Sequence, residues 1–308
     1  MENTRAKTTR NSLILLLTAT IWGMAFVSQS KGMDYMHPFT FNGVRSLIGA
    51  AGILVYILIS RKIAGDKAAK LDWKLNVRAG LLCGIFLTIA STLQQFGIKY
   101  TSVGKAGFIT TLYIIFVPMF GIFLKKKVAP VVWAAAGMAA VGMYLLCMTE
   151  SLRLGAGDIM VFLCAIAFAI QIMTVDHYAE RIDGAVVSCI QFTVCGVVCC
   201  IGALIWGQPT FGQLQDGLGA LLYAGVLSCG VGYTLQIVGQ KGLNPTVAAL
   251  IMSLESVIAT ISGWIAYKIG FLSTDQTLTP RQIAGCVIVF TAVILVQLPP
   301  EWFRFGKK

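Results

Sequence analysis

Charged residues are scarce in this sequence, and the motifs of several enzyme classes are missing from it. Only 12% of the 308 residues are charged, whereas 57% are hydrophobic, and the mean hydropathy is +0.79. An average soluble domain carries about 25% charged residues, so the composition predicts an integral membrane protein instead. The patterns HExxH, GxSxG and GxxxxGK[ST] do not occur. We therefore expect no ATP-hydrolysing domain and no cofactor, and an integral membrane enzyme is the least favoured class.

Patterns for disulfides and metal sites are also missing. Two histidines are too few for a dedicated zinc site, and none of the nine cysteines forms a CxxC pair. Cys195, Cys199 and Cys200 have helical spacing, which would allow a metal cluster. Since all nine cysteines fall in apolar segments, small packing residues are the favoured interpretation, and no metal is expected.

Long hydrophobic runs dominate what is present. A bilayer core about 30 Å thick needs about 20 apolar residues per helix, and runs of that length recur between charges, Gly and Pro. We predict an all-α integral membrane fold with ten transmembrane helices. The predicted helices span residues 11–30, 38–60, 75–98, 102–124, 128–149, 157–178, 184–206, 217–239, 245–269 and 280–298.

Lysine and arginine set the expected orientation, because cytoplasmic loops retain these residues. With both termini inside, the inner side holds seventeen of the 24 and the outer side six, while Arg45 lies within the second helix. We predict a multi-pass protein of the inner (plasma) membrane with cytoplasmic N- and C-termini. The formal charge of +11 is then a topology signal plus contact with anionic lipid, and nucleic acid is not an expected partner.

An internal repeat is the most informative pattern. The segment GIKYTSVGKAGFITTLYIIF (97–116) aligns without a gap with GQKGLNPTVAALIMSLESVI (239–258), 142 residues later. Helices three and four thus match helices eight and nine, so helices one to five (1–150) repeat as six to ten (151–308) within one structural unit. Five is odd, so the two repeats are inverted. That arrangement is typical of secondary transporters with a site near the bilayer midplane.

Five segments together carry a family resemblance. They are Trp22-Gly23, Arg45, AGFITTLYIIFVPMFG from Ala106, LESVIATISGWIAY from Leu254, and PRQIAGCVIVFTAVILVQL from Pro280. Along essentially the whole chain, the sequence resembles the drug/metabolite transporter superfamily and specifically its EamA branch of ten-helix carriers. The resemblance implies a central cavity between two five-helix halves, alternating access, and no ATP-hydrolysing domain.

Two ionisable residues lie deep in the predicted helices. Arg45 is about seven residues into the second helix, and Glu255 is about ten residues into the ninth. A charge there costs about 2.5–3.5 kcal/mol on insertion scales, so both are functional candidates. We expect Arg45 to meet an anionic substrate group and Glu255 to take up a proton or a cationic group. The alternative is structural: an Arg45–Glu255 ion pair, or Arg45 bonded to backbone carbonyls.

Other polar and aromatic residues complete the candidate substrate or coupling site. The repeat places Tyr113 opposite Glu255, and a comparable offset places Gln191 opposite Arg45. Some of these side chains must face a wet cavity, although packing or interfacial anchoring is the alternative for the aromatic residues near helix ends. The full set, besides Arg45 and Glu255, is Trp22, Gln94, Gln95, Tyr113, Gln171, Gln191, Tyr233 and Gln236.

Two further features are expected to shape the helices. Pro118 frees a backbone carbonyl inside the fourth helix, which suggests a kink that gates access. Gly80 and Gly84 form a GxxxG face for close packing between the halves, or between protomers of a homodimer.

These patterns favour a secondary-active transporter that exports a small metabolite, driven by protons or another coupling ion. One buried cation and one buried anion suit a zwitterion such as an amino acid. An amphipathic drug or a nucleoside-like metabolite would also fit. A channel or facilitative pore is the main alternative, and the inverted repeat argues against it.

Overall fold

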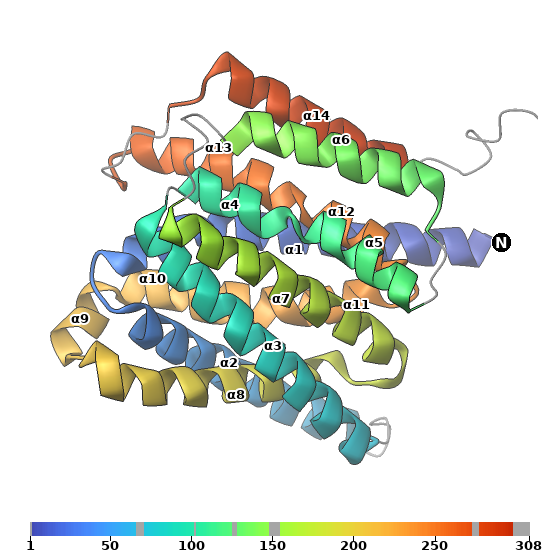
Figure 1. Ribbon diagram of the computed structural model, residues 1–308. Helices are drawn as coiled ribbons and strands as arrows, with labels where there is room; N and C mark the ends of the chain where they lie inside the picture. Colours follow the sequence, from blue (N-terminus) through green and yellow to red (C-terminus); the bar gives the residue numbers. More distant parts are fainter. Residues whose placement is uncertain are drawn as a thin grey trace, which may run out of the picture.

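The computed structural model describes residues 2–65, 71–101, 103–124, 128–147, 155–272 and 277–297. These residues form helices and turns, with no strand among them, as the composition predicts (Figure 1). In chain order the elements are α1 (Glu2–Met33), α2 (Pro38–Ala64), α3 (Trp73–Tyr100), α4 (Val103–Thr111), α5 (Tyr113–Phe123), α6 (Pro130–Cys147), α7 (Ala156–Tyr178), η2 (Ala179–Arg181), α8 (Gly184–Gly202), η3 (Ala203–Gly207), α9 (Phe211–Asp216), α10 (Leu218–Leu222), η4 (Tyr223–Gly232), α11 (Tyr233–Gln240), α12 (Pro245–Met252), α13 (Leu254–Lys268) and α14 (Pro280–Gln297).

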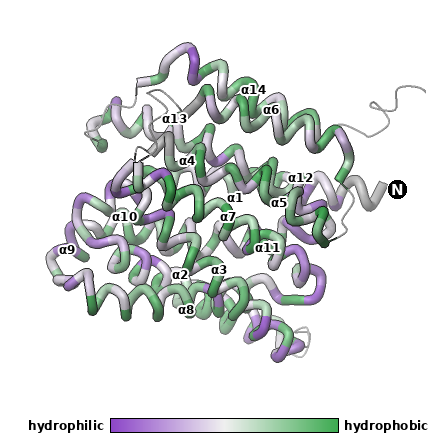
Figure 2. The backbone as a smooth tube through the Cα atoms, in the orientation of Figure 1, coloured by the Kyte–Doolittle hydropathy of each residue, from purple (hydrophilic) through white to green (hydrophobic). Residues whose placement is uncertain are grey.

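Eight helical stretches in the described part of the chain are long and apolar enough to cross a membrane. Two shorter apolar helices, Pro130–Leu145 and Pro280–Leu295, occupy the segments predicted for the fifth and tenth spans. The predicted ends of those two spans, at 148–149 and 298, lie outside the described residues, as does the predicted start of the fourth span at 102. Hydrophobic residues run along the helices, and hydrophilic ones gather towards the ends of the bundle (Figure 2).

Helix starts follow capping residues in the sequence. Pro38 opens α2 behind His37, whose ring accepts the Phe39 N–H, and Pro245 opens α12 behind the Asn244 cap. Pro is preferred in the first helical turn because its missing N–H would have no helical partner there. These caps fix where two of the spans that line the site begin.

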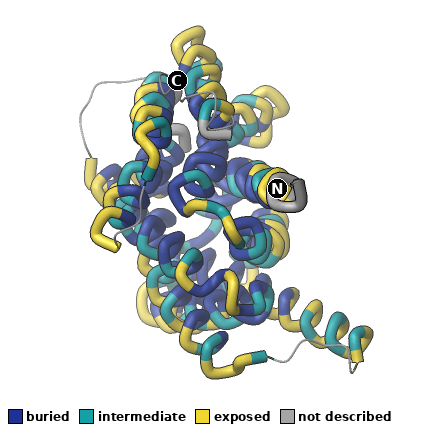
Figure 3. The backbone as a smooth tube through the Cα atoms, turned by 90° about the vertical axis from the view of Figure 1, so that its right-hand side faces the viewer, coloured by how far each residue is buried: buried dark blue, intermediate teal, exposed yellow. Residues whose placement is uncertain are grey.

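Helices from the two ends of the chain interleave. α3 packs on α7 and α8, α2 packs on α8 and η4, and α1 packs on α13 and α11. α6 and α14 lie side by side along one edge (Figure 1). Buried residues fill the middle of the bundle, and exposed residues lie towards its outside (Figure 3).

The GxxxG face of α3 is used inside the chain. A Cβ at Gly80 would lie 2.6 Å from the Ile190 Cβ, and one at Gly84 would lie 2.9 Å from the Val194 Cβ. Both contacts are with α8, so the two glycines allow α3 and α8 to approach closely. Homodimerisation stays a prediction.

Two of the spans are interrupted. The helix over 103–123 breaks at Leu112, between α4 and α5, and the helix over 245–268 breaks at Ser253, between α12 and α13. At each break, a backbone N–H donates to the carbonyl three residues earlier instead of four. These hydrogen bonds join Leu112 N to Ile109 O at 3.2 Å and Ser256 N to Ser253 O at 3.1 Å. Pro118 is buried within α5, beyond the break, and its gating role stays a prediction.

Candidate functional site

A narrow cavity lies in the middle of the bundle, with walls from α1–α5, α7, α8, η4, α11 and α13. The space that water molecules can occupy in it is about 40 Å³, room for about three waters. This central cavity is therefore too tight for a metabolite in the present conformation. Its lining residues are Trp22, Ala25, Phe26, Gln29, Arg45, Ser46, Leu87, Ser91, Gln94, Thr110, Tyr113, Phe168, Gln171, Ile172, Phe192, Ser228, Cys229, Tyr233, Gln236 and Glu255.

The structure brings together most of the residues proposed from the sequence. Gln95 and Gln191 are buried outside the lining. Gln95 Nε2 donates to the Gln29 carbonyl at 3.3 Å, and Gln191 lies on α8 beside Gly84. Those that line the central cavity are Trp22, Arg45, Gln94, Tyr113, Gln171, Tyr233, Gln236 and Glu255.

Arg45 is held by a neutral partner. Arg45 is only 5% exposed, and its Nε donates to Asn42 Oδ1 at 2.9 Å. Asn42 is oriented in turn by donating to the Ser91 carbonyl at 2.9 Å, and the guanidinium lies 5.3 Å from the centre of the Phe41 ring. Among the described residues no salt bridge joins Arg45 to Glu255. The guanidinium thus keeps its charge available to the cavity.

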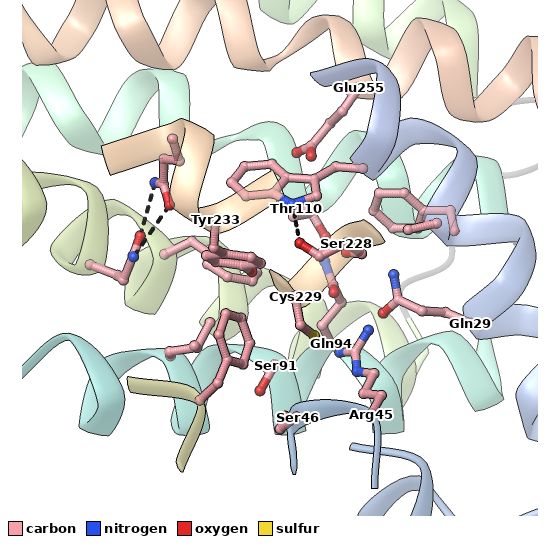
Figure 4. Close-up of a pocket in the computed structure, with 18 of the residues that line it drawn as sticks. Gln29, Arg45, Ser46, Ser91, Gln94, Thr110, Ser228, Cys229, Tyr233 and Glu255 are labelled. Carbon is pink, nitrogen blue, oxygen red and sulfur yellow. Dashed lines mark hydrogen bonds between the residues drawn. The ribbon is translucent and has the colours of Figure 1, made fainter. Parts of the chain in front are cut away.

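Glu255 lies at the opposite side of the central cavity from Arg45 (Figure 4). It is 4% exposed, in the first turn of α13, two residues after the break at Ser253. The Tyr113 hydroxyl donates to its Oε1 at 3.0 Å. The two residues that the repeat aligns are therefore hydrogen-bonded to each other.

Aromatic rings form another part of the wall. Trp22 and Tyr233 have ring centroids 4.5 Å apart, and Phe192 meets Tyr233 edge-on at 5.0 Å. Trp22 Nε1 donates to the Ser228 carbonyl at 3.4 Å (Figure 4). Ser228 lies in η4, a π-helical segment, and such segments often occur at functional sites.

Amide side chains supply the remaining polarity. Gln171 and Gln236 bond each other reciprocally, at 3.5 Å and 3.2 Å. Gln94 Nε2 donates to Thr110 Oγ1 at 3.3 Å. Gln29 projects from α1 on the same side as Gln94 and Arg45 (Figure 4).

Sequence reasoning missed several polar lining residues. Gln29 could have been found, since it precedes Gln171 by the repeat spacing of 142. The small residues carry no such signal, because Ser, Thr and Cys in apolar helices commonly bond the preceding turn or pack. The missed polar residues are Gln29, Ser46, Ser91, Thr110, Ser228 and Cys229.

The chemical groups around the central cavity suit a small polar ligand. A guanidinium offers donors only, so it suits an acceptor or anionic group. Glu255 can exchange a proton or accept from a donor, and the aromatic wall covers an apolar part of a ligand.

Comparisons with known proteins agree with this architecture. The chain matches the EamA-like transporter family over residues 10–148 and again over 155–298. It is 27% identical over 290 residues to an uncharacterized transporter of Archaeoglobus fulgidus, covering 92% of this chain and 84% of that one. It is 24% identical over 294 residues to the uncharacterized transporter YwfM of Bacillus subtilis, covering 94% of each. A solved crystal structure has a TM-score of 0.74 at 16% identity over 96% of this chain and 99% of its own, which shows a shared fold.

Proposed function

Because the chain belongs to the EamA-like transporter family, we propose that it is a secondary-active exporter of a small, amino-acid-like zwitterion. It works by alternating access at the central cavity. The observation that carries this proposal is that Arg45 and Glu255, both buried, line one cavity from opposite sides without pairing. The carboxylate of a zwitterion would supply the anionic partner that Arg45 does not have within the cavity.

The proposal includes ten spans in two inverted halves, residues 1–150 and 151–308. Equivalent close contacts support it. A Cβ at Gly97 would lie 3.0 Å from the Gly157 carbonyl, and a Cβ at Gly239 would lie 2.8 Å from the Leu15 side chain. Gly239 and Gly157 follow Gly97 and Leu15 by the same 142 residues as the aligned repeat. The helix breaks at Leu112 and Ser253 fall within one residue of that spacing.

The small volume of the central cavity supports a carrier over an open pore. With room for about three waters, the cavity is too small to hold a metabolite in this conformation. A substrate must therefore enter through a rearrangement of the helices. That requirement is what alternating access supplies.

Proteoliposomes test the carrier and its coupling together. The probe is a ¹⁴C-labelled mixture of L-amino acids. Wild-type protein is expected to take it up by counterflow, and an acid interior is expected to drive uptake uphill. Glu255→Gln should keep counterflow and lose the pH-driven uptake, because an amide cannot release a proton. Glu180→Gln removes a carboxylate exposed outside the cavity, so it should keep both.

Each result has a distinct meaning. A Glu255→Gln protein that is still driven by the pH gradient would overturn the coupling role. Wild-type flux without counterflow would identify a pore. Everted membrane vesicles decide the direction, since an exporter accumulates the probe in them and not in right-side-out vesicles.

A further inference from the structure

Four glutamines occupy corresponding places in the two halves of the chain. Gln29 on α1 and Gln171 on α7 are 142 residues apart, and so are Gln94 on α3 and Gln236 on α11. This is the spacing that relates Tyr113 to Glu255. All four glutamines line the central cavity. Each half thus contributes one pair of carboxamides to the same space.

In the second half, Gln171 and Gln236 are hydrogen-bonded to each other. Gln171 and Gln236 each donate to the other's Oε1, at 3.5 Å and 3.2 Å. Gln171 is fully buried and Gln236 is 1% exposed. Each amide thereby satisfies a donor and an acceptor of its counterpart.

In the first half, no hydrogen bond joins Gln29 to Gln94 among the described residues. Gln94 donates to Thr110 rather than to Gln29. Gln29 is 4% exposed, and its Oε1 has no hydrogen-bond partner among the described residues. A buried acceptor without a donor destabilises a protein, because water no longer solvates it. The corresponding oxygen in the other half has its donor, so the difference lies at Gln29.

We propose that Gln29, with Gln94 beside it, forms the subsite for the N–H donors of the substrate, an amine or ammonium group. An ammonium carries three donors, and the Gln29 oxygen and the Gln94 amide oxygen are acceptors on the wall that Arg45 also lines. Donor-only Arg45 takes the carboxylate, and acceptor Gln29 takes the amine. This assignment rests on the proposed function, because it needs the substrate in the central cavity.

The subsite leaves Glu255 to proton transfer. Glu255 lies across the cavity from Arg45 and already accepts the Tyr113 hydroxyl. With the amine held on the Arg45 side, recognition and coupling use different residues.

The test compares ligands that differ only in the amine. Detergent-purified protein is titrated by thermal shift with L-amino acids and with the corresponding des-amino carboxylic acids. Wild-type protein is expected to prefer the amino acids, and Gln29→Leu to reduce that preference by about tenfold, the size of one hydrogen bond to a charged group. The Gln29 Oε1 has no hydrogen-bond partner among the described residues, and the Gln29 backbone carbonyl, which accepts from Gln95, is unchanged in the leucine variant. Gln191 is a buried glutamine outside the lining, and neither of its amide atoms has a hydrogen-bond partner among the described residues, so Gln191→Leu should keep the preference.

A conservative variant guards against a folding effect. Gln29→Glu retains an acceptor and is expected to retain or strengthen the preference for the amine. An undiminished preference in Gln29→Leu overturns the subsite and leaves the proposed function standing. Wild-type protein that neither binds amino acids nor exchanges them by counterflow overturns the proposed substrate class, and the subsite with it.

Discussion

The imidazole of His37 caps α2 between the first two spans. Its Nδ1 accepts the Phe39 N–H at 3.3 Å. Burial lowers the pKa of His37 below 6.5, and the charge of Lys99 lowers this pKa further. Because the pKa is lower in the folded protein, the unfolded chain binds more protons in this range. Stability is therefore lost as the pH falls through about 6.5 towards the folded pKa.

We predict that His37→Asn makes the protein less sensitive to acid. Asparagine also caps helices but does not titrate in this range. The melting temperature of wild-type protein in detergent is expected to fall more than that of the variant between about pH 7.5 and pH 5.5. Equal pH dependence would show that another group governs acid sensitivity.

The sequence located some cavity residues and missed others for a physical reason. Tyr113 and Glu255 stand out because the ungapped repeat aligns a deep tyrosine with a deep acid. Gln191 was a candidate because it is polar and an offset comparable to the repeat spacing places it opposite Arg45, yet it lies outside the lining. A polar residue in an apolar helix indicates that its side chain needs a polar partner or water. A central helix has neighbours on several sides, so this polarity does not show which side the residue faces. The rotation of α8 that directs Gln191 away is set by packing, which one sequence does not contain.

At the level of elements, η4 and α2 approach so closely that glycine is required. A Cβ at Gly225 would lie 2.7 Å from Ile48 Cγ2 and 2.9 Å from the Arg45 carbonyl. The backbone carrying Arg45 is thus placed directly against η4. Any side chain at Gly225 must push α2 outwards.

We predict that Gly225→Val destabilises the protein by about 1–3 kcal/mol, the range for overpacking a well-packed core. Amino acid counterflow should fall with it, because Arg45 moves with α2. Gly219→Val is the control, since a Cβ there meets nothing within 4 Å. The measurements are melting in detergent and counterflow in proteoliposomes. Similar melting temperatures for the two variants would mean that α2 moves without cost.

Element positions follow from hydrophobic runs and caps, but interruptions do not. The proline at 118 was the kink signal inside the fourth predicted helix, whereas the breaks fall at Leu112 and Ser253. Neither Leu nor Ser excludes a helical conformation, so these breaks depend on how α4, α5, α12 and α13 pack. The π-helical segment η4 packs against α1 and α2, and no signal in the sequence analysis predicted its conformation.

For the whole molecule, the charge distribution predicts which ends face the cytoplasm. Glu180 on η2 and Gln215 on α9 are exposed, and the proposed orientation places them on opposite sides of the membrane. The eight cysteines whose side chains the structure describes are buried or half-buried, so an introduced cysteine should dominate labelling.

We predict that a membrane-impermeant maleimide labels Gln215→Cys in intact cells and labels Glu180→Cys only after permeabilisation. Gel shift with a maleimide–polyethylene glycol reports each reaction. Denatured samples confirm that both cysteines can react. The reverse pattern would place the termini outside and would overturn the predicted orientation.

The all-helical membrane fold was accessible from the sequence because hydropathy locates the apolar spans, whereas the ten-span count and the inverted repeat stay predictions. The pairing of helices was not accessible, since nearly every span is apolar and could pack on any other. Small contacts decide it, such as Gly80 and Gly84 against α8.

The Tyr113–Glu255 hydrogen bond joins two positions that the repeat makes equivalent. In the inverted repeat that we propose, a contact between equivalent positions lies on the axis relating the halves, so exchanging the conformations of the halves maps this contact onto itself. In the proposed cycle this hydrogen bond lies on the axis about which the two halves exchange conformations, whereas contacts away from the axis must rearrange. The acid in the cavity then occupies the place that moves least. In the coupling role that we propose for Glu255, its proton changes sides because the surrounding helices expose it first to one aqueous phase and then to the other.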